Sequence, residues 1–197
     1  MLLESLPALA LFAFVSSVTP GPNNLMLMAS GANFGLRRTV PHMLGISIGF
    51  AVLMVLLGIG LVQIFDRFPL IYTVLKAASI VYLLFLAWKI ANAAPIRHGI
   101  GKGQPMTFVQ AAAFQWVNPK AWAMALTAIT VYITDAPTGM LVLAACVFST
   151  VNLPSVTLWA VMGQQMARVL TNPARLRWFN WTMAVLLVAS LYPVLLV

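Results

Sequence analysis

Residues 5–34 read SLPALALFAFVSSVTPGPNNLMLMASGANF and carry no charged side chain. A helix needs about 20 mostly apolar residues to cross the hydrocarbon core of a bilayer, so this stretch is long enough to span it. Its middle, TPGPNN at residues 19–24, cannot continue an unbroken helix, because Pro20 and Pro22 remove amide donors and clash with the preceding turn. The sequence therefore predicts a first membrane span that is broken or kinked.

The rest of the chain has the same apolar character. Of its 197 residues, 62% are hydrophobic and only 7% are charged, and the mean hydropathy is +0.97. So few charges cannot cover a water-soluble globule, and lipid is therefore the expected solvent. We expect an all-α membrane protein with six transmembrane helices and no large soluble domain. The further apolar runs cover residues 40–65, 69–91, 107–133, 138–164 and 178–197.

The fourth of the six runs is also interrupted, at Asn118-Pro119. Asparagine is a favoured N-cap and proline suits the first helical position, so a new half-helix is expected to begin here. Pro20 and Pro119 are 99 residues apart, which puts a break in the first helix of each half of the chain. Because each half has an odd number of spans, the second half would insert upside down, as in many secondary transporters. The spacing predicts a 3+3 inverted repeat: a first repeat over 1–91, a cytoplasmic linker over 92–106 and a second repeat over 107–197.

Basic residues are distributed unevenly between the two sides of the predicted bundle. The first, third and fifth connections contain Arg37, Arg38, Lys89, Arg97, Lys102, Arg168, Arg175 and Arg177. The opposite side holds one basic residue, Arg67, together with Glu4, Asp66 and Asp135. By the positive-inside rule, both termini are expected outside the cytoplasm. The N-terminus lacks the positive segment of a signal peptide, so we expect the first apolar run to remain as a helix.

Lys120 lies about 13 residues into the fourth span, close to the bilayer midplane at a rise of about 1.5 Å per residue. An ammonium group at that depth cannot easily reach the headgroups. Irregular backbone there is tolerated only where protein or a water-filled cavity satisfies its polar groups, so we expect the two breaks to face each other. The half-helix starts after Gly21 and Asn118 would then offer amides and a positive dipole end to a carboxylate, and Lys120 would add a full charge.

These arguments define a candidate transport path for a small-molecule substrate. A simpler interpretation of the first break is a proline kink that only shapes packing. The candidate path comprises Thr19, Pro20, Gly21, Pro22, Asn23, Asn24, Gln115, Asn118, Pro119, Lys120 and Asn152.

Other polar and small residues in the spans have structural roles as their default interpretation. For Gln115, Asn152 and Ser155 that role is interhelical hydrogen bonding. The GxxxG pairs Gly31-Gly35 and Gly45-Gly49 indicate close helix packing.

Several functional classes lack support in the sequence. The formal charge is +8, but the 11 basic residues are scattered between apolar runs and form no patch for nucleic acid. The single cysteine, Cys146, excludes an internal disulfide and a thiolate metal cluster, and His42 and His98 have no partner at metal-ligand spacing. The chain contains no catalytic, nucleotide-binding or zinc motif, so we expect neither enzyme activity nor a cofactor.

The motifs named above resemble the lysine exporter and homoserine/threonine exporter superfamily, over essentially the whole chain. The most specific of them is TPGPNN at residues 19–24, placed in the first span of a short six-span protein. The weaker matches are the glycines at 31, 35, 45 and 49, Tyr82-Leu83-Leu84 with Trp88-Lys89, and Asn118-Pro119-Lys120.

This resemblance implies a bacterial inner-membrane exporter of amino acids or close derivatives that is driven by an ion gradient or the membrane potential. It also implies that Pro20, Pro22, Asn23, Asn24, Asn118 and Pro119 line or shape the transport path. The fifth-span stretch Val151-Asn152-Leu153-Pro154-Ser155 further resembles the branch that exports cysteine and O-acetylserine. Small neutral substrates are therefore favoured.

The predicted spans contain no Asp or Glu. This disfavours lysine as the substrate, because a cationic side chain would gain from a carboxylate in the cavity. A proton-coupled carrier commonly uses a membrane carboxylate, so here Lys120 would have to exchange the proton instead. The alternative function is a channel, or a membrane scaffold that only assembles with partners. The sequence leaves open whether the chain forms a homo-oligomer.

Overall fold

The computed structural model describes residues 2–61, 67–93, 104–133 and 137–192, and every regular element within these ranges is helical. The helices are α1 (Leu2–Val18), α2 (Pro22–Phe34), α3 (Leu36–Leu56), α5 (Pro69–Ala91), α6 (Phe108–Phe114), α7 (Pro119–Thr127), α8 (Thr138–Val169) and α9 (Pro173–Ala189). π-Helical turns, Leu57–Leu61 and Ala128–Tyr132, extend α3 and α7, and a 3-10 turn, Gln115–Val117, follows α6. Two acids that the sequence places opposite the basic connections, Asp66 and Asp135, lie outside the described residues. So does most of the linker, with Arg97, His98 and Lys102.

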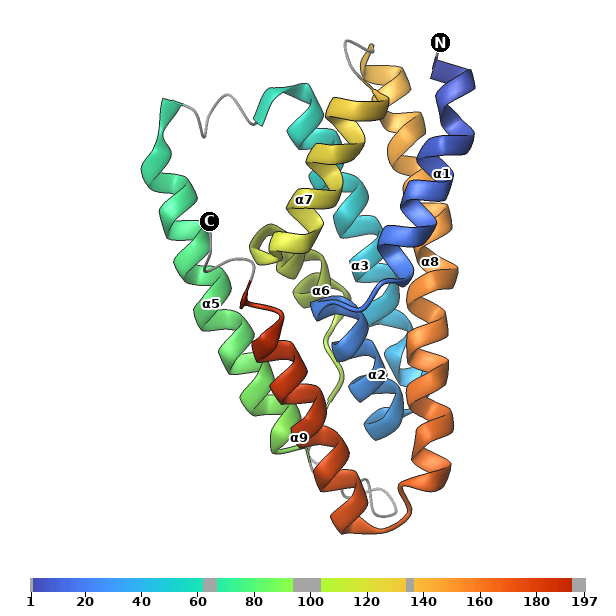
Figure 1. The fold of residues 1–197 in the computed structure, drawn as a ribbon, viewed down its shortest axis with the longest axis vertical. Coiled ribbons are helices and arrows are strands. Elements are labelled where there is room, and N and C mark those ends of the chain that lie inside the picture. Colours follow the sequence, from blue (N-terminus) through green and yellow to red (C-terminus); the bar gives the residue numbers. More distant parts are fainter. Residues whose placement is uncertain (1, 62–66, 94–103, 134–136, 193–197) are drawn as a thin grey trace.

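Successive segments run up and down the long axis of an elongated bundle (Figure 1). The long helix α8 packs against α1, α2 and α3, while α3 also contacts α6 and α7. On the other side of the bundle, α5 and α9 lie against each other (Figure 1). The described part of the chain is all-helical, as the sequence predicts.

The length and apolar character of the helices indicate several membrane spans. Leu36–Leu61, Thr73–Ala91 and Thr138–Val169 are each long and apolar enough to cross a bilayer. The pair Ser5–Val18 and Pro22–Phe34 passes the same criterion as one unit bent by 55°. The prediction of a broken first span is thus confirmed. α9 has 17 residues and the α6 to α7 region is interrupted, so the six-span count stays a prediction.

Two buried apolar clusters fill the bundle. One contains residues of α2, α5, α6 and α9, including Leu27 and Leu83. The other contains residues of α1, α7 and the first half of α8, including Leu9 and Phe148. Both clusters extend onto α3 and α8, and the residues between Ala13 of the second cluster and Leu25 of the first include the break between α1 and α2. The polar residues of the break therefore lie between two apolar regions.

Three of the four glycines in the GxxxG pairs lie in tight helix contacts, as predicted. A Cβ atom on Gly31 would overlap the carbonyl oxygen of Ala160, and one on Gly45 would overlap that of Phe108. A Cβ on Gly49 would lie 2.6 Å from the Cα of Ala112. These glycines let α2 approach α8 and let α3 approach α6.

For Gly35 the prediction of close packing is wrong. Its φ is +78°, a conformation that residues with a Cβ rarely adopt, and a Cβ placed there would meet nothing within 4 Å. Gly35 is instead the single residue that separates α2 from α3. Its amide completes the last turn of α2 by bonding to the carbonyl of Gly31 at 3.0 Å. Its role is to turn the chain.

Candidate functional site

The first break frees backbone carbonyls at the end of α1, and side chains from elsewhere satisfy them. The side-chain amide of Asn24 donates to the carbonyls of Ser17 and Thr19, both at 2.8 Å. The indole of Trp159 on α8 donates to the carbonyl of Val18 at 3.1 Å. The break is therefore a stable feature, because protein groups replace the hydrogen bonds that the helix gives up.

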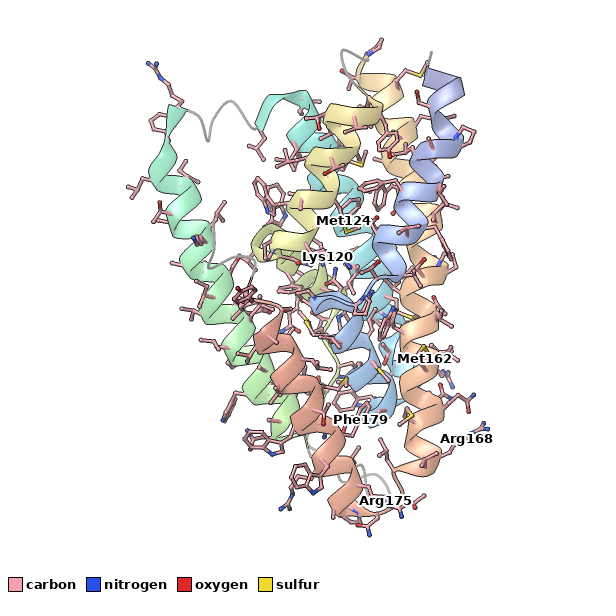
Figure 2. All side chains as sticks on the ribbon, in the orientation of Figure 1. Lys120, Met124, Met162, Arg168, Arg175 and Phe179 are labelled. Carbon is pink, nitrogen blue, oxygen red and sulfur yellow. The ribbon has the colours of Figure 1, made fainter. Side chains whose placement is uncertain are left out.

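Lys120 supplies the charged partner of the same break. Its ammonium group donates to the carbonyl of Thr19 at 2.5 Å and contacts that of Pro20 at 3.4 Å. The side chain passes so close to Gly21 that a Cβ there would lie 2.6 Å from its Cδ. Figure 2 shows Lys120 near the middle of the long axis. A positive charge thus lies at the C-terminal end of α1, where the helix dipole is negative.

The second break begins a new helix as the sequence predicts. Asn118 is the N-cap of α7, and its side-chain oxygen accepts a hydrogen bond from the amide of Lys120 at 3.2 Å. Pro119 occupies the first turn. By contrast, Gly21 gives α2 no side-chain cap. At α7 the N-cap side chain already occupies one of the amides that the sequence predicts a half-helix start to offer.

The two breaks face each other, which confirms the prediction made from membrane depth. The side-chain amides of Asn23 and Gln115 exchange two hydrogen bonds, at 2.9 and 3.2 Å. Gln115 is fully buried and also donates to the carbonyl of Ala111 at 2.9 Å. On the far side of the second break, the hydroxyl of Ser79 on α5 donates to the carbonyl of Val117. The broken helices are thus joined through side chains 92 positions apart.

Asn152 on α8 completes the polar layer. Its side-chain oxygen accepts from the hydroxyl of Ser47 on α3 at 2.9 Å, and its amide nitrogen donates to the hydroxyl of Ser17 at 3.0 Å. Interhelical hydrogen bonding, the role expected for Gln115 and Asn152, is therefore confirmed. For Ser155 that expectation is wrong, since its hydroxyl donates to the carbonyl of Val151 within the same helix.

A small cavity lies where these groups meet, and we call it the polar cavity. Its free space is about 20 Å³, which is room for about one water molecule. Its walls are formed by Ser16, Ser17, Gly21, Asn23, Asn24, Ile46, Phe50, Gln115, Asn118, Lys120, Ala121, Met124, Asn152 and Val156. The walls offer amides, hydroxyls and one ammonium group but no carboxylate. A solute of several non-hydrogen atoms is larger than this space, so the bundle would have to open before one could bind.

Most of the predicted path residues line the polar cavity, and the others shape it. The lining members are Gly21, Asn23, Asn24, Gln115, Asn118, Lys120 and Asn152. Thr19 and Pro20 supply the carbonyls that bind Lys120, while Pro22 and Pro119 begin the half-helices. Sequence reasoning missed Ser16, Ser17, Phe50 and Met124. The two serines could have been found, because only Val18 separates them from TPGPNN.

A bundle of apolar helices with two broken helices around a polar cavity is typical of membrane transport proteins. Comparison with known proteins agrees with this class, since the profile of the LysE type translocators matches residues 14–190. The chain belongs to the LysE type translocator family. Membership in a family of translocators also fits the expectation that the chain is not an enzyme.

Curated relatives match over most of their length. A cysteine/O-acetylserine efflux protein of Klebsiella pneumoniae subsp. pneumoniae is 31% identical over 186 residues, which is 90% of each chain. The protein of the same name from Escherichia coli strain K12 is 30% identical over 185 residues, again 90% of each chain. No solved structure matches this chain.

Proposed function

We propose that this protein is a secondary transporter that exports a small neutral amino acid, or a close derivative, across the bacterial inner membrane. The observation that carries the proposal is the polar cavity, in which two broken helices meet and the ammonium group of Lys120 lies on the carbonyls of one of them. The names of the curated relatives, which are cysteine and O-acetylserine efflux proteins, support the substrate class.

The chain would cross the membrane six times, with both termini on the periplasmic side. In this arrangement residues 1–91 and 107–197 form two inverted repeats, and 92–106 form a cytoplasmic linker. Matching contacts in the two halves support the repeat, because α8 packs against α1 as α3 packs against α6. The exposed arginines Arg168 and Arg175, at one end of the bundle, support the orientation (Figure 2).

The substrate carboxylate would bind between α2 and Lys120. Gly21 leaves α2 uncapped, so the amides of Asn23 and Asn24 and the positive end of the helix dipole favour an anion there. The substrate ammonium would bind the side-chain carbonyls of Asn23 and Gln115. Because the cavity walls carry no carboxylate, a second positive charge on the substrate would find no partner.

Lys120 would also couple binding to movement. In the closed state its ammonium group bonds to neutral carbonyls of the first break. A carboxylate is a stronger acceptor, so a bound substrate would draw the ammonium group away from Thr19 and Pro20. The end of α1 would then lose a charged partner and move more easily. The substrate would thereby favour an open state over the closed one, which alternating access requires.

Efflux from preloaded cells tests the proposal. Cells loaded with labelled cysteine, O-acetylserine, serine or alanine are compared with and without the protein. The intact protein should give saturable, stereoselective efflux of at least one compound. Lys120→Met and Asn23→Ala should each lower its rate about tenfold or more, the effect of losing a hydrogen bond to a charged group. Lys76→Met, at the half-buried lysine of α5, removes the same charge outside the cavity and should change little.

Two outcomes would contradict different parts of the proposal. If no amino acid leaves faster with the protein than without it, the export function is wrong. If export is saturable but both cavity variants transport normally at equal membrane abundance, the site is wrong. Efflux that neither saturates nor distinguishes stereoisomers would indicate a channel.

A further inference from the structure

A second, larger cavity lies between α2, α3, α5 and the segment 104–106, and we call it the His42 cavity. Its free space is about 310 Å³, within the range of about 300–1,000 Å³ that is usual for ligand pockets. Most of its wall is apolar, and the polar side chains in it are Ser30, Asn33, His42, Lys89, Asn92 and Gln104. Of the two cavities, this is the one with room for an amino acid in the closed conformation.

His42 is the buried polar side chain in this wall that lacks a partner. It is 1% exposed, and neither ring nitrogen makes a hydrogen bond to any part of the chain that the structure describes. The neighbouring buried groups are engaged: Ser30 bonds to Thr39 at 2.9 Å, and Asn33 bonds to Asn180 at 2.9 Å. Burying a polar group without a partner is costly, and a neutral imidazole offers one donor and one acceptor. His42 is thus suited to a ligand that supplies both.

The His42 cavity and the polar cavity are adjacent along the same two helices. On α3, His42 and Ile46 are one turn apart, and Ile46 lines the polar cavity. On α2, Met26 lines the His42 cavity and Asn23 lines the polar cavity. Met26 and Ile46 are 4% and 0% exposed and belong to one apolar cluster. A layer of apolar side chains about one turn thick therefore separates the cavities.

The His42 cavity lies at the basic end of the bundle. Lys89 and Asn92, at the end of α5, are exposed and line it. The neighbouring start of α3 carries exposed Arg37 and Arg38. The end of α5 lies at the same end of the bundle as the connection between α8 and α9, where Arg168 lies (Figures 1 and 2). The positive-inside rule assigns this end to the cytoplasm.

We propose that the His42 cavity is a cytoplasmic entry chamber in which the exported amino acid binds before it reaches the polar cavity. The imidazole of His42 accepts a hydrogen bond from the substrate ammonium, and Lys89 at the exposed edge attracts the carboxylate. Met26 and Ile46 close the passage between the two sites. This inference rests on the proposed export function and adds a binding site to it.

Transport measured separately from each face tests the chamber. In inside-out vesicles the cytoplasmic face is outside, so His42→Leu should raise the KM of uptake about tenfold, the effect of losing a hydrogen bond to a charged group, with little change in kcat. His42→Gln keeps a donor and an acceptor and should restore much of the affinity. In right-side-out vesicles, KM from the periplasmic face should not change. Arg37→Gln, which alters an exposed charge outside the cavity, is the control.

Labelling of an introduced cysteine gives a measurement that does not depend on replacing His42. Asn92→Cys is made in a Cys146→Ser background, so that it is the one thiol in the chain. Substrate at saturating concentration should slow its modification by maleimide, and should leave that of Thr171→Cys, at the same end of the bundle, unchanged.

The results separate the chamber from the export function. If the KM of His42→Leu from the cytoplasmic face equals that of the intact protein, or if substrate gives Asn92→Cys no protection, the chamber is overturned and export stands. Absence of transport by the intact protein overturns the export function, and the chamber with it.

Discussion

Lys120 is the side chain whose role changes most between sequence and structure. Its position in the sequence predicts an ammonium group near the bilayer midplane that binds a substrate carboxylate. The structure instead places the ammonium group on the carbonyls of Thr19 and Pro20, at the negative end of the α1 dipole. A lysine can satisfy a broken helix in the closed state and bind a substrate when the helix opens, because its long stem lets the ammonium group move.

Gly21→Ala tests how closely Lys120 must fit. A Cβ at this position would lie 2.6 Å from the lysine Cδ, and the flexible lysine stem is the part that would give way. We therefore expect normal membrane abundance but an export rate lowered about tenfold, since the ammonium group would lose its position and with it a charged hydrogen bond. Efflux from preloaded cells measures this.

Gly139→Ala is the matched control, because a Cβ there would meet nothing within 4 Å. Equal export by the two variants would show that the packing of Lys120 against Gly21 does not matter for transport.

The helix starts at the two breaks are built differently. α7 has a proline in its first turn and an asparagine cap, whereas α2 has a proline and no side-chain cap. The half-helix α2 is held against the longer helix α8 by close backbone contact at Gly31 on α2 and Gly163 on α8. The capped helix is thus tied down at its start, and the uncapped one leaves amides available at the polar cavity.

Comparing two N-caps separates their structural and functional roles. Asn118 caps α7 and lines the polar cavity, whereas Asn172 caps α9 at an exposed position. Replacing either one with Ala should lower stability by about 1 kcal/mol, the usual worth of an N-cap. Unfolding of the purified protein in detergent measures this loss.

Only Asn118→Ala should also slow export beyond what its abundance in the membrane explains. If both variants export equally well, Asn118 acts only as a cap.

The bundle as a unit is polarised by its basic residues. Exposed arginines of α3, α8 and α9 and the exposed Lys89 of α5 belong to the connections predicted on one side. By the positive-inside rule, this distribution favours the orientation in which the His42 cavity faces the cytoplasm, as the proposed entry chamber requires.

Reporter fusions test this orientation. Alkaline phosphatase, which is active only outside the cytoplasm, should be active when fused after Val197 and inactive when fused after Thr171, between α8 and α9. A fluorescent protein that folds only in the cytoplasm should give the opposite pattern. The reverse result at both sites would place the His42 cavity on the periplasmic side and contradict the proposed entry chamber.

Much of the architecture follows from the sequence alone. Four of the six apolar runs match the described helices to within four residues, because the free energy of inserting a segment depends on its own composition. The other two differ more, since α8 ends five residues after its predicted run and α9 begins five residues before its run. The prolines at 20, 22 and 119 predict the breaks, and Asn118 predicts a cap, because these effects act within one helical turn. That the breaks must face each other follows from the absence of water at membrane depth.

The partners of these groups follow only from the tertiary structure. The bonds between Asn23 and Gln115, and between Lys120 and Thr19, join residues 92 and 101 positions apart. The same holds for the cavity at His42, which needs α2, α3 and α5 together, and for Gly35, whose GxxxG spacing suggests packing although its backbone makes a turn. Local sequence patterns indicate helix propensity and the tendency of a segment to insert into the membrane. The position of one side chain against another depends on how whole helices pack, and no single stretch of sequence carries that information.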